Sequence, residues 1–363
     1  MLKSFYRFIY RHVDSHSPVH NAARKIIFAA MNFKYRALKL HVNNSCNLKC
    51  KTCYCHFEGK GNILTREEIF RLIDQLKIFG HNLDLHILGG EPLLREDIFE
   101  IIDYAGRKLK KILLFTNAML INRETAIKIK NSRIAAVIAT LHSYDGHIHD
   151  SITRESFSWD RAIAGMQNLI EAGVPTYSFT VLLPHNAGHL AGIERFVKGM
   201  GAKTMYFPYI KQCPQDSLCM VNKKEFQEAI SWAFHKSREY QNKLLSILNK
   251  RPKACSAFVS TISIKSDGNV TPCPFLDLSL GNIKNEKFYS ILNRASRNKD
   301  LLGFLSVPAE CGKCSLVEMC GGGCKAFRYN HYRDFVSRDE NCSGPFEEKI
   351  PLERIGDFLP YVF

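Results

Sequence analysis

Short apolar runs alternate with longer amphipathic segments between residues 37 and 210. The runs have the length of β-strands and lie at residues 38–42, 83–88, 112–115, 134–141, 177–183 and 205–209. Apolar runs of this length, bounded by turn residues, are typical of strands in a buried sheet. Because helical patterns separate them, they predict an α/β fold with a parallel sheet covered by helices.

The helical patterns have recognisable ends. Thr65-Arg-Glu-Glu68 is a capping box, and the apolar residues after it keep a helical period as far as Gly80. Further helices are expected at residues 98–104, at 159–172 before Gly173, and at 221–248. The last pattern ends in a short basic sequence, 250–253, which we interpret as a domain boundary.

Three cysteines follow the first predicted strand at spacings of four and three positions, Cys46, Cys50 and Cys53. Three thiolates can hold three irons of a four-iron four-sulfur cluster and leave the fourth iron without a protein ligand. A structural zinc site is the alternative, and it would take its fourth ligand from Cys55 or His56.

A second motif, Gly89-Gly90-Glu91-Pro92, follows the second predicted strand. Glycines let backbone carbonyls approach a ligand closely, and a carboxylate suits an ammonium group. A plain Gly-Gly turn is the alternative for this motif taken alone. In this order and spacing, the two motifs resemble those of the radical S-adenosylmethionine (radical SAM) enzymes.

The resemblance implies a partial (β/α)6 barrel of the TIM type, with its active site at the carboxyl ends of the strands. Cys46, Cys50 and Cys53 would then hold the catalytic cluster. The segment from Gly89 through Gly90 to Glu91 would receive the methionine amine of S-adenosylmethionine.

Three further cofactor contacts are implied at later strand ends. Asn117 lies in Thr-Asn-Ala, which matches a family Thr-Asn-Gly only in part because Ala118 replaces the glycine. Ser143 would reach the ribose of the cofactor, and Arg154 its carboxylate. Surface or core polar roles are the alternatives. Histidines 142, 147 and 149 are close in sequence, but no carboxylate pattern supports a metal site there.

Seven cysteines are concentrated beyond residue 250. They are Cys255, Cys273, Cys311, Cys314, Cys320, Cys324 and Cys342. Two structural zinc sites are the alternative, and they would leave three thiols unexplained. The spacing resembles the SPASM extension of radical SAM enzymes that modify peptides and proteins, a small cysteine-rich α+β domain.

That resemblance implies two auxiliary four-iron clusters and hence three in the whole chain. Cys311, Cys314, Cys320 and Cys342 would hold one of them completely. Cys255, Cys273 and Cys324 would hold the other with a ligand missing, unless Cys213 or Cys219 completes it. An open iron there is the hypothesis that this count favours.

The predicted organisation is a basic N-terminal arm (1–36), a radical SAM barrel (37–250), a SPASM domain (251–345) and a C-terminal tail (346–363). Net charge is +15 over 363 residues. Residues 1–40 hold eight Lys or Arg and a single acid, which suits a solvated helix or contact with an acidic peptide, a membrane surface or nucleic acid. No nucleic-acid module is recognised.

The thirteen cysteines and the absence of an export signal indicate metal ligation in a reducing cytoplasm. No apolar run approaches the roughly 20 residues of a transmembrane helix. We expect an external electron donor of the flavodoxin or ferredoxin type. Residues 1–36 leave no room for a folded peptide-recognition domain, so leader binding would require a separate protein or another surface.

The function expected from the resemblance is hydrogen abstraction from a ribosomally made peptide, leading to a crosslink, an oxidation or an epimerised centre. A formylglycine-forming activity is disfavoured, because Pro274 follows Cys273 where sulfatase-maturing relatives have an acid. The alternatives are an enzyme of the same kind acting on a small or lipid-linked metabolite, and a non-catalytic iron-sulfur carrier or scaffold.

Overall fold

The computed structural model describes residues 36–55, 63–76, 83–210, 228, 232, 255, 257–258, 260–295, 306–339, 342 and 344–348. The basic N-terminal arm, Cys213, Cys219 and most of the expected helix at 221–248 lie outside these residues. So does most of the C-terminal tail.

A nine-stranded sheet organises the described chain, with the strand order β6-β5-β4-β3-β2-β1-β7-β8-β9. The strands are β1 (Ala37–His41), β2 (Asp84–Leu88), β3 (Lys111–Thr116), β4 (Ile134–Thr140), β5 (Thr176–Leu182), β6 (Lys203–Pro208), β7 (Thr261–Ile264), β8 (Asn269–Thr271) and β9 (Gly281–Asn282). Strands β1 to β6 are parallel to their neighbours, as the alternating pattern predicts. All six predicted strands are confirmed, and none of their ends differs by more than two residues.

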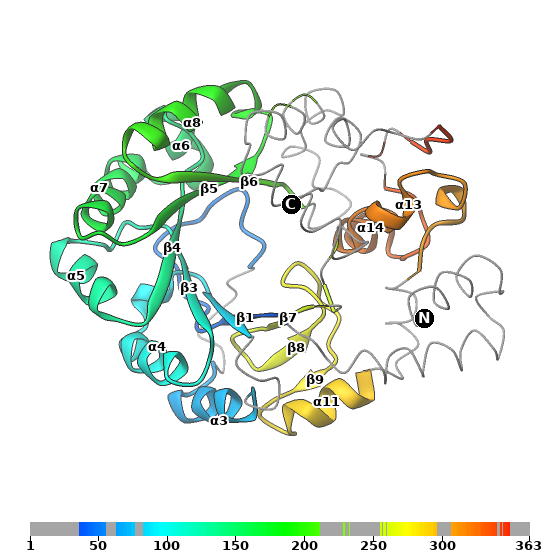
Figure 1. Ribbon diagram of the computed structural model, residues 1–363, viewed down its shortest axis with the longest axis horizontal. Coiled ribbons are helices and arrows are strands. Elements are labelled where there is room, and N and C mark those ends of the chain that lie inside the picture. The colour runs from blue at the N-terminus through cyan, green and yellow to red at the C-terminus, as the bar shows by residue number, and fades with distance from the viewer. Residues whose placement is uncertain are drawn as a thin grey trace.

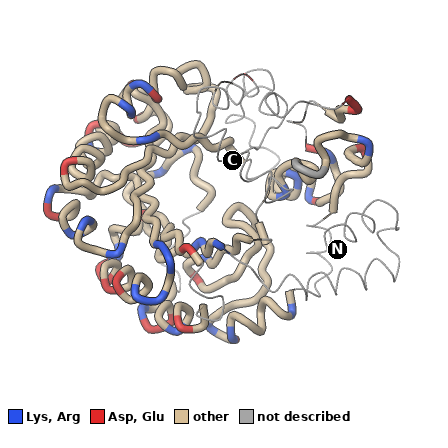
Figure 2. Tube along the Cα trace, viewed as in Figure 1, with Lys and Arg blue, Asp and Glu red and all other residues tan. Residues whose placement is uncertain are grey.

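Helices cover the convex face of this curved sheet (Figure 1). They are α3 (Arg66–Leu76), α4 (Ile98–Gly106), α5 (Arg123–Asn131), α6 (Gly146–Thr153), α7 (Ser158–Glu171) and α8 (Leu190–Gly199), with short 3-10 turns η2 (Pro92–Leu94) and η3 (Ala187–His189). Charged residues of both signs follow these outer helices (Figure 2). The fold is therefore the expected partial barrel with its helical layer outside.

The main core lies between the sheet and the helices. Leu38 and Leu40 of β1 are fully buried there, in one cluster with Ile69 and Ile73 of α3 and Ile101 of α4. The capping box before α3 is confirmed. The Glu68 carboxylate accepts from the Thr65 backbone nitrogen at 2.8 Å, and the Thr65 hydroxyl accepts from the Glu68 backbone nitrogen at 3.2 Å. Such reciprocal bonds satisfy amides that a helix end leaves unpaired.

The cysteine-rich segment joins the barrel sheet directly. Strand β7 pairs in parallel with β1, and β8 and β9 extend the sheet in antiparallel pairing. The segment continues with α11 (Phe288–Ala295), η4 (Ala309–Cys311), α13 (Val317–Cys320) and α14 (Lys325–Tyr332). This mixture of short strands and helices is the expected α+β domain. Among the described helices, none combines the length and the apolar character that crossing a membrane requires.

Candidate active site at the carboxyl ends of the strands

The three-cysteine loop begins where β1 ends. Cys46, Cys50 and Cys53 are all partly buried, and burial raises the pKa of Cys46 to about 11 and that of Cys50 to about 12, with the neighbouring thiols adding to both shifts. The Lys51 nitrogen ties the loop to α6 by donating to the Ile152 carbonyl at 2.8 Å. Bringing three thiols together in this environment is costly for free thiolates, and ligation to iron offsets that cost.

Gly89 and Gly90 allow the loop after β2 to lie directly against the cysteine loop. A Cβ atom on Gly90 would lie 2.0 Å from the Ser45 carbonyl oxygen and 3.0 Å from the Cys46 Cβ. A Cβ atom on Gly89 would lie 2.3 Å from the Asn43 side-chain oxygen. These glycines are therefore needed for a close approach of two backbones, whatever they contribute to ligand binding.

Glu91 is fully buried beneath this contact. Its carboxylate accepts from the Thr116 hydroxyl at 2.8 Å, from the Asn117 nitrogen at 2.8 Å and from the Leu93 nitrogen at 3.1 Å. Burial raises its pKa to about 7 in spite of these bonds. Glu91 thus links the β2 loop to the end of β3, in addition to the ligand role predicted for it.

Asn117 connects the end of β3 to the cysteine loop. Its amide donates to the Asn47 side-chain oxygen at 2.7 Å and lies 3.9 Å from the Cys46 sulfur. Ala118, which stands where the family motif has glycine, has a φ of 64°. That is the left-handed conformation for which glycine is the usual choice, so the backbone of the motif is retained although its residue has changed.

The other two predicted cofactor residues, Ser143 and Arg154, follow β4 along the chain. Arg154 ends α6 in a left-handed conformation and is close enough to Cys50 for its charge to favour the thiolate. Ser143 is fully buried, and its hydroxyl accepts from the Asp145 nitrogen at 3.0 Å. Contacts of either side chain with the cofactor remain predictions.

The histidines after β4 have structural surroundings. The His142 backbone nitrogen donates to the His149 ring at 3.2 Å, and both rings are buried while His147 is exposed. Among the described residues, no three His, Cys, Asp or Glu side chains are arranged to hold a single metal ion.

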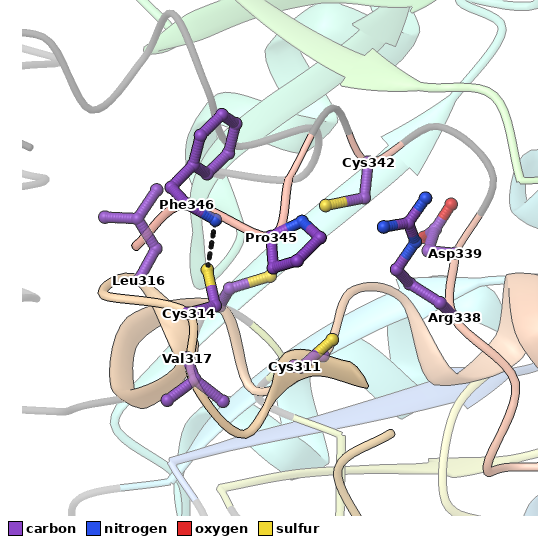
Figure 3. A pocket seen from close by; sticks show the side chains of 11 residues that line it. Cys311, Cys314, Leu316, Val317, Arg338, Asp339, Cys342, Pro345 and Phe346 are labelled. Atoms are coloured by element: carbon purple, nitrogen blue, oxygen red, sulfur yellow. Dashed lines mark hydrogen bonds between the residues drawn. The ribbon is translucent and has the colours of Figure 1, made fainter. Parts of the chain in front are cut away.

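Four of the predicted auxiliary ligands line one cavity. Its walls include Cys311, Cys314, Cys320 and Cys342. Figure 3 shows the labelled sulfur atoms around this cavity, with the Phe346 nitrogen donating to the Cys314 sulfur at 3.4 Å. Four thiols around one cavity fit a four-iron cluster, which separates its thiolates by its own iron and sulfide atoms.

The remaining three auxiliary thiols form a second group. Cys255 and Cys273 are both near enough to Cys324 to raise its pKa, although burial is the larger cause. The Cys324 sulfur also caps α14 by accepting from the Phe327 nitrogen at 3.4 Å. A fourth ligand from Cys213 or Cys219 would lie outside the described residues.

Two buried charges lie between the auxiliary groups, and sequence reasoning missed both. Asp339 is 1% exposed, lines the four-thiol cavity and accepts from the Cys324 nitrogen at 3.3 Å. Arg328 is fully buried, and this burial lowers the pKa of its guanidinium, while the nearby groups Asp339, Cys324 and Cys311 oppose the shift. Arg328 lies in α14 and Asp339 in the loop after it, and no sequence pattern around either residue predicts a buried charge.

Asn43 is a further residue that sequence reasoning missed. Its side chain accepts from the Gly90 nitrogen at 3.0 Å and donates to the Glu91 carbonyl at 2.8 Å. The Asn-Asn-Ser sequence before Cys46 was the available signal, because asparagine often bridges backbone groups in loops.

Comparison with known families agrees with this geometry. Residues 40–197 match the radical SAM superfamily, and residues 255–324 match SPASM, described as an iron-sulfur cluster-binding domain. These matches cover the cysteine loop, the Gly-Gly-Glu segment and most of the auxiliary thiols.

Individual relatives are distant but cover most of the chain. The AdoMet-dependent heme synthase of Nitratidesulfovibrio vulgaris is 24% identical over 83% of this chain and 90% of its own length. The mycofactocin maturase MftC of Mycobacterium tuberculosis is 26% identical over 85% and 83%. The structure of Streptococcus suis SuiB bound to its precursor peptide SuiA superposes with a TM-score of 0.69 and 17% identity, over 90% of this chain and 82% of that one.

Proposed function

The chain is a radical SAM enzyme with a C-terminal SPASM domain, and we propose that it abstracts hydrogen from a ribosomally synthesised peptide to install a crosslink, an oxidation or an epimerised centre. The observation that carries the proposal is the meeting of Cys46, Asn117 and Glu91, which come from the ends of three neighbouring strands. The auxiliary thiols join the same sheet through β7.

Cys46, Cys50 and Cys53 would hold a four-iron cluster, which when bound and reduced would supply the one electron needed to cleave the sulfonium of S-adenosylmethionine into methionine and a 5'-deoxyadenosyl radical. The chain's own residues bind and orient the cofactor. Glu91, ionised, attracts the methionine ammonium, while Gly89 and Gly90 keep the backbone close to it. An external flavodoxin or ferredoxin is the electron donor in this proposal.

The auxiliary groups complete the proposal. With clusters on Cys311, Cys314, Cys320 and Cys342 and on Cys255, Cys273 and Cys324, the chain holds three clusters in all. Hydrogen abstraction leaves a substrate radical, and an oxidised product requires the removal of one more electron. The auxiliary thiols lie in the domain that extends the barrel sheet, and the oxidised four-iron clusters that they would hold could receive that electron.

The likeness to SuiB bound to its precursor peptide SuiA supports the peptide substrate, as do the relatives named mycofactocin maturase and antilisterial bacteriocin subtilosin biosynthesis protein. A small-molecule substrate is the second candidate, because three relatives named heme synthases match 83–88% of the chain. A separate leader-binding protein is expected in the first case only.

The test uses full-length protein purified anaerobically and reduced with dithionite. Short peptides encoded beside the gene, made with deuterium at each Cα and Cβ, are added with S-adenosylmethionine. The proposal expects 5'-deoxyadenosine that carries one deuterium and a peptide that has lost it. Unlabelled 5'-deoxyadenosine with every peptide argues against the peptide substrate, and no 5'-deoxyadenosine at all contradicts the enzyme activity.

A further inference from the structure

A row of polar side chains crosses three neighbouring strands on the concave face of the sheet. Lys39 of β1 is in register with His86 of β2 and with Ser263 of β7. Leu38 and Leu40 lie in the core with the outer helices, and successive side chains of a strand point to opposite faces. Lys39 and its two neighbours in register therefore face away from the helices.

These side chains carry hydrogen-bonding atoms that no described residue satisfies. Three buried atoms have no partner among the described residues: the His86 Nδ1, the Ser263 Oγ and the His41 Nε2. His41 follows Lys39 by two residues on β1, on the side nearer the cysteine loop. Ser263 is fully buried and His41 is 5% exposed. Buried polar atoms left unpaired are unfavourable and uncommon in folded proteins, so three on one face indicate a ligand that satisfies them.

The row has a cationic character. No ion pair or hydrogen bond of the Lys39 ammonium is found within the described part of the chain. Asp84 lies on the same face of β2, two residues before His86. Its buried Oδ1 also has no partner among the described residues, and it forms no ion pair with Lys39. Lys265, two residues after Ser263, forms an ion pair with Asp277.

Both imidazoles are neutral near pH 7. Burial, followed by the charge of Lys39, lowers the pKa of His86 to about 4. Burial, then Lys265 and Lys39, lowers the pKa of His41 to about 3. The row thus offers one cation and several neutral hydrogen-bonding groups, a combination that suits a carboxylate.

An aromatic arc adjoins the polar row and shares His86 and His41 with it. Its members share ring contacts with centroids 4.6–6.1 Å apart and run from β2 through β3, β5 and β6 to the loop after β8, the cysteine loop and β1. They are His86, Phe115, Phe179, Phe207, Phe275, Tyr54 and His41. Apart from His41, each is only partly buried.

The arc joins both cluster regions. Tyr54 follows the catalytic thiol Cys53 directly, and Phe275 lies two residues after the auxiliary thiol Cys273. A flat ring placed against this arc would lie between the two thiol groups. Aromatic pairs contribute binding free energy beyond that of the apolar area that they bury.

We propose that the concave face selects a substrate that bears a carboxylate beside a flat aromatic group, with the carboxylate at Lys39, His86 and Ser263 and the ring against the aromatic arc. This inference rests on the proposed function and names the substrate chemistry of that same site. An acidic aromatic peptide segment and a small aromatic acid both have this chemistry.

The test measures charge preference with matched probes on the reduced, cluster-loaded enzyme in the presence of S-adenosylmethionine. One pair is 2-naphthoate and the neutral 2-naphthamide; the other is N-acetyl-Trp-Glu-amide and N-acetyl-Trp-Gln-amide. In the wild type, at least one carboxylate probe should bind about tenfold more tightly than its amide, which corresponds to about 1.4 kcal/mol. The pair that shows the larger ratio identifies the source of the carboxylate.

Substitutions assign this preference to the site. Lys39→Met should reduce the ratio to near one, Lys39→Arg should retain most of it, and Phe179→Leu should weaken both members of a pair alike. Lys198→Met, at an exposed lysine of the outer helix α8, is the matched control and should leave the ratio unchanged. Equal or absent binding in both pairs, or a ratio that Lys39→Met does not alter, overturns the inference.

The proposed function is tested by separate measurements on the same samples. Formation of 5'-deoxyadenosine without added probe reports cofactor cleavage, and iron content and Tm report folding of each variant. Cleavage without charge preference overturns the inference alone. Charge preference without cleavage overturns the proposed function and leaves the binding chemistry standing.

Discussion

Replacing Gly90 by alanine is expected to displace the three-cysteine loop. The added Cβ would lie 2.0 Å from the Ser45 carbonyl oxygen and 2.4 Å from its carbon. For the distance from this Cβ to the Ser45 oxygen to reach even 3.0 Å, the backbone next to Cys46 has to move by about 1 Å. Overpacking of this kind typically lowers the free energy of unfolding by about 1–3 kcal/mol. The obstacle is backbone, so no side-chain rotation relieves it.

The expected result is loss of the catalytic cluster with the auxiliary clusters kept. Gly90→Ala should lose about four irons per chain and at least tenfold in 5'-deoxyadenosine formation. Gly89→Ala should be milder, since its added Cβ meets the side chain of Asn43 first. Gly188→Ala is the matched control, because nothing lies within 4 Å of a Cβ there.

Iron analysis, absorbance and chromatography of 5'-deoxyadenosine on the three variants check this order. A Gly90→Ala protein with full iron content and wild-type cleavage would refute the reasoning that these glycines hold two loops together. Equal losses in Gly90→Ala and Gly188→Ala would also refute it.

Three other predictions follow from single contacts. Because burial raises the pKa of Glu91 to about 7, the free energy of unfolding should fall as pH rises from about 4.5 to 7. The ionised carboxylate is the form that attracts an ammonium group, so the affinity for S-adenosylmethionine, measured by calorimetry, should rise roughly tenfold from pH 5.5 to 7. Glu91→Gln should abolish that rise. Thr65→Ala removes one bond of the capping box and should cost about 1 kcal/mol in thermal unfolding, with wild-type stability as the contrary result. Cys311→Ala with Cys314→Ala should remove the cluster of the four-thiol cavity and leave cofactor cleavage without substrate intact; loss of that cleavage would contradict separate roles for the two centres.

Much of the barrel could be predicted because its signals are local. The apolar runs and the capping box at Thr65 identify strands and a helix start from a few neighbouring residues. Helices α5, α6 and α8 were not predicted. In α5, for example, Asn122 caps the helix by accepting from the Thr125 nitrogen, but only Ala126 and Ile129 are buried, so the apolar stripe is narrow.

The pairing of β7 with β1 could not be predicted in the same way. It joins Leu38 to Ile262 across more than two hundred residues, and no local pattern specifies such a partner. The polar row depends on this pairing, because Ser263 reaches Lys39 only through it. For the same reason, the position of Asp339 beside both auxiliary thiol groups became visible only in three dimensions.

The thiol groups were predictable because their spacing is itself the signal. The structure adds what holds the catalytic loop: the Asn43 side chain donates to the Glu91 carbonyl, the Glu91 nitrogen donates to the Ser45 carbonyl, and the Asn117 side chain donates to that of Asn47. Sequence spacing indicates which ligands belong together but not which neighbours fix their position.

The most direct test of the central claim is 5'-deoxyadenosine formation by the reduced enzyme, compared with the variant in which Cys46, Cys50 and Cys53 are all alanine. The account predicts formation in the wild type and none in the variant. The variant should lack about four irons per chain and keep the absorbance of the auxiliary clusters. Equal cleavage of S-adenosylmethionine by both proteins would contradict the assignment of the catalytic cluster to this loop.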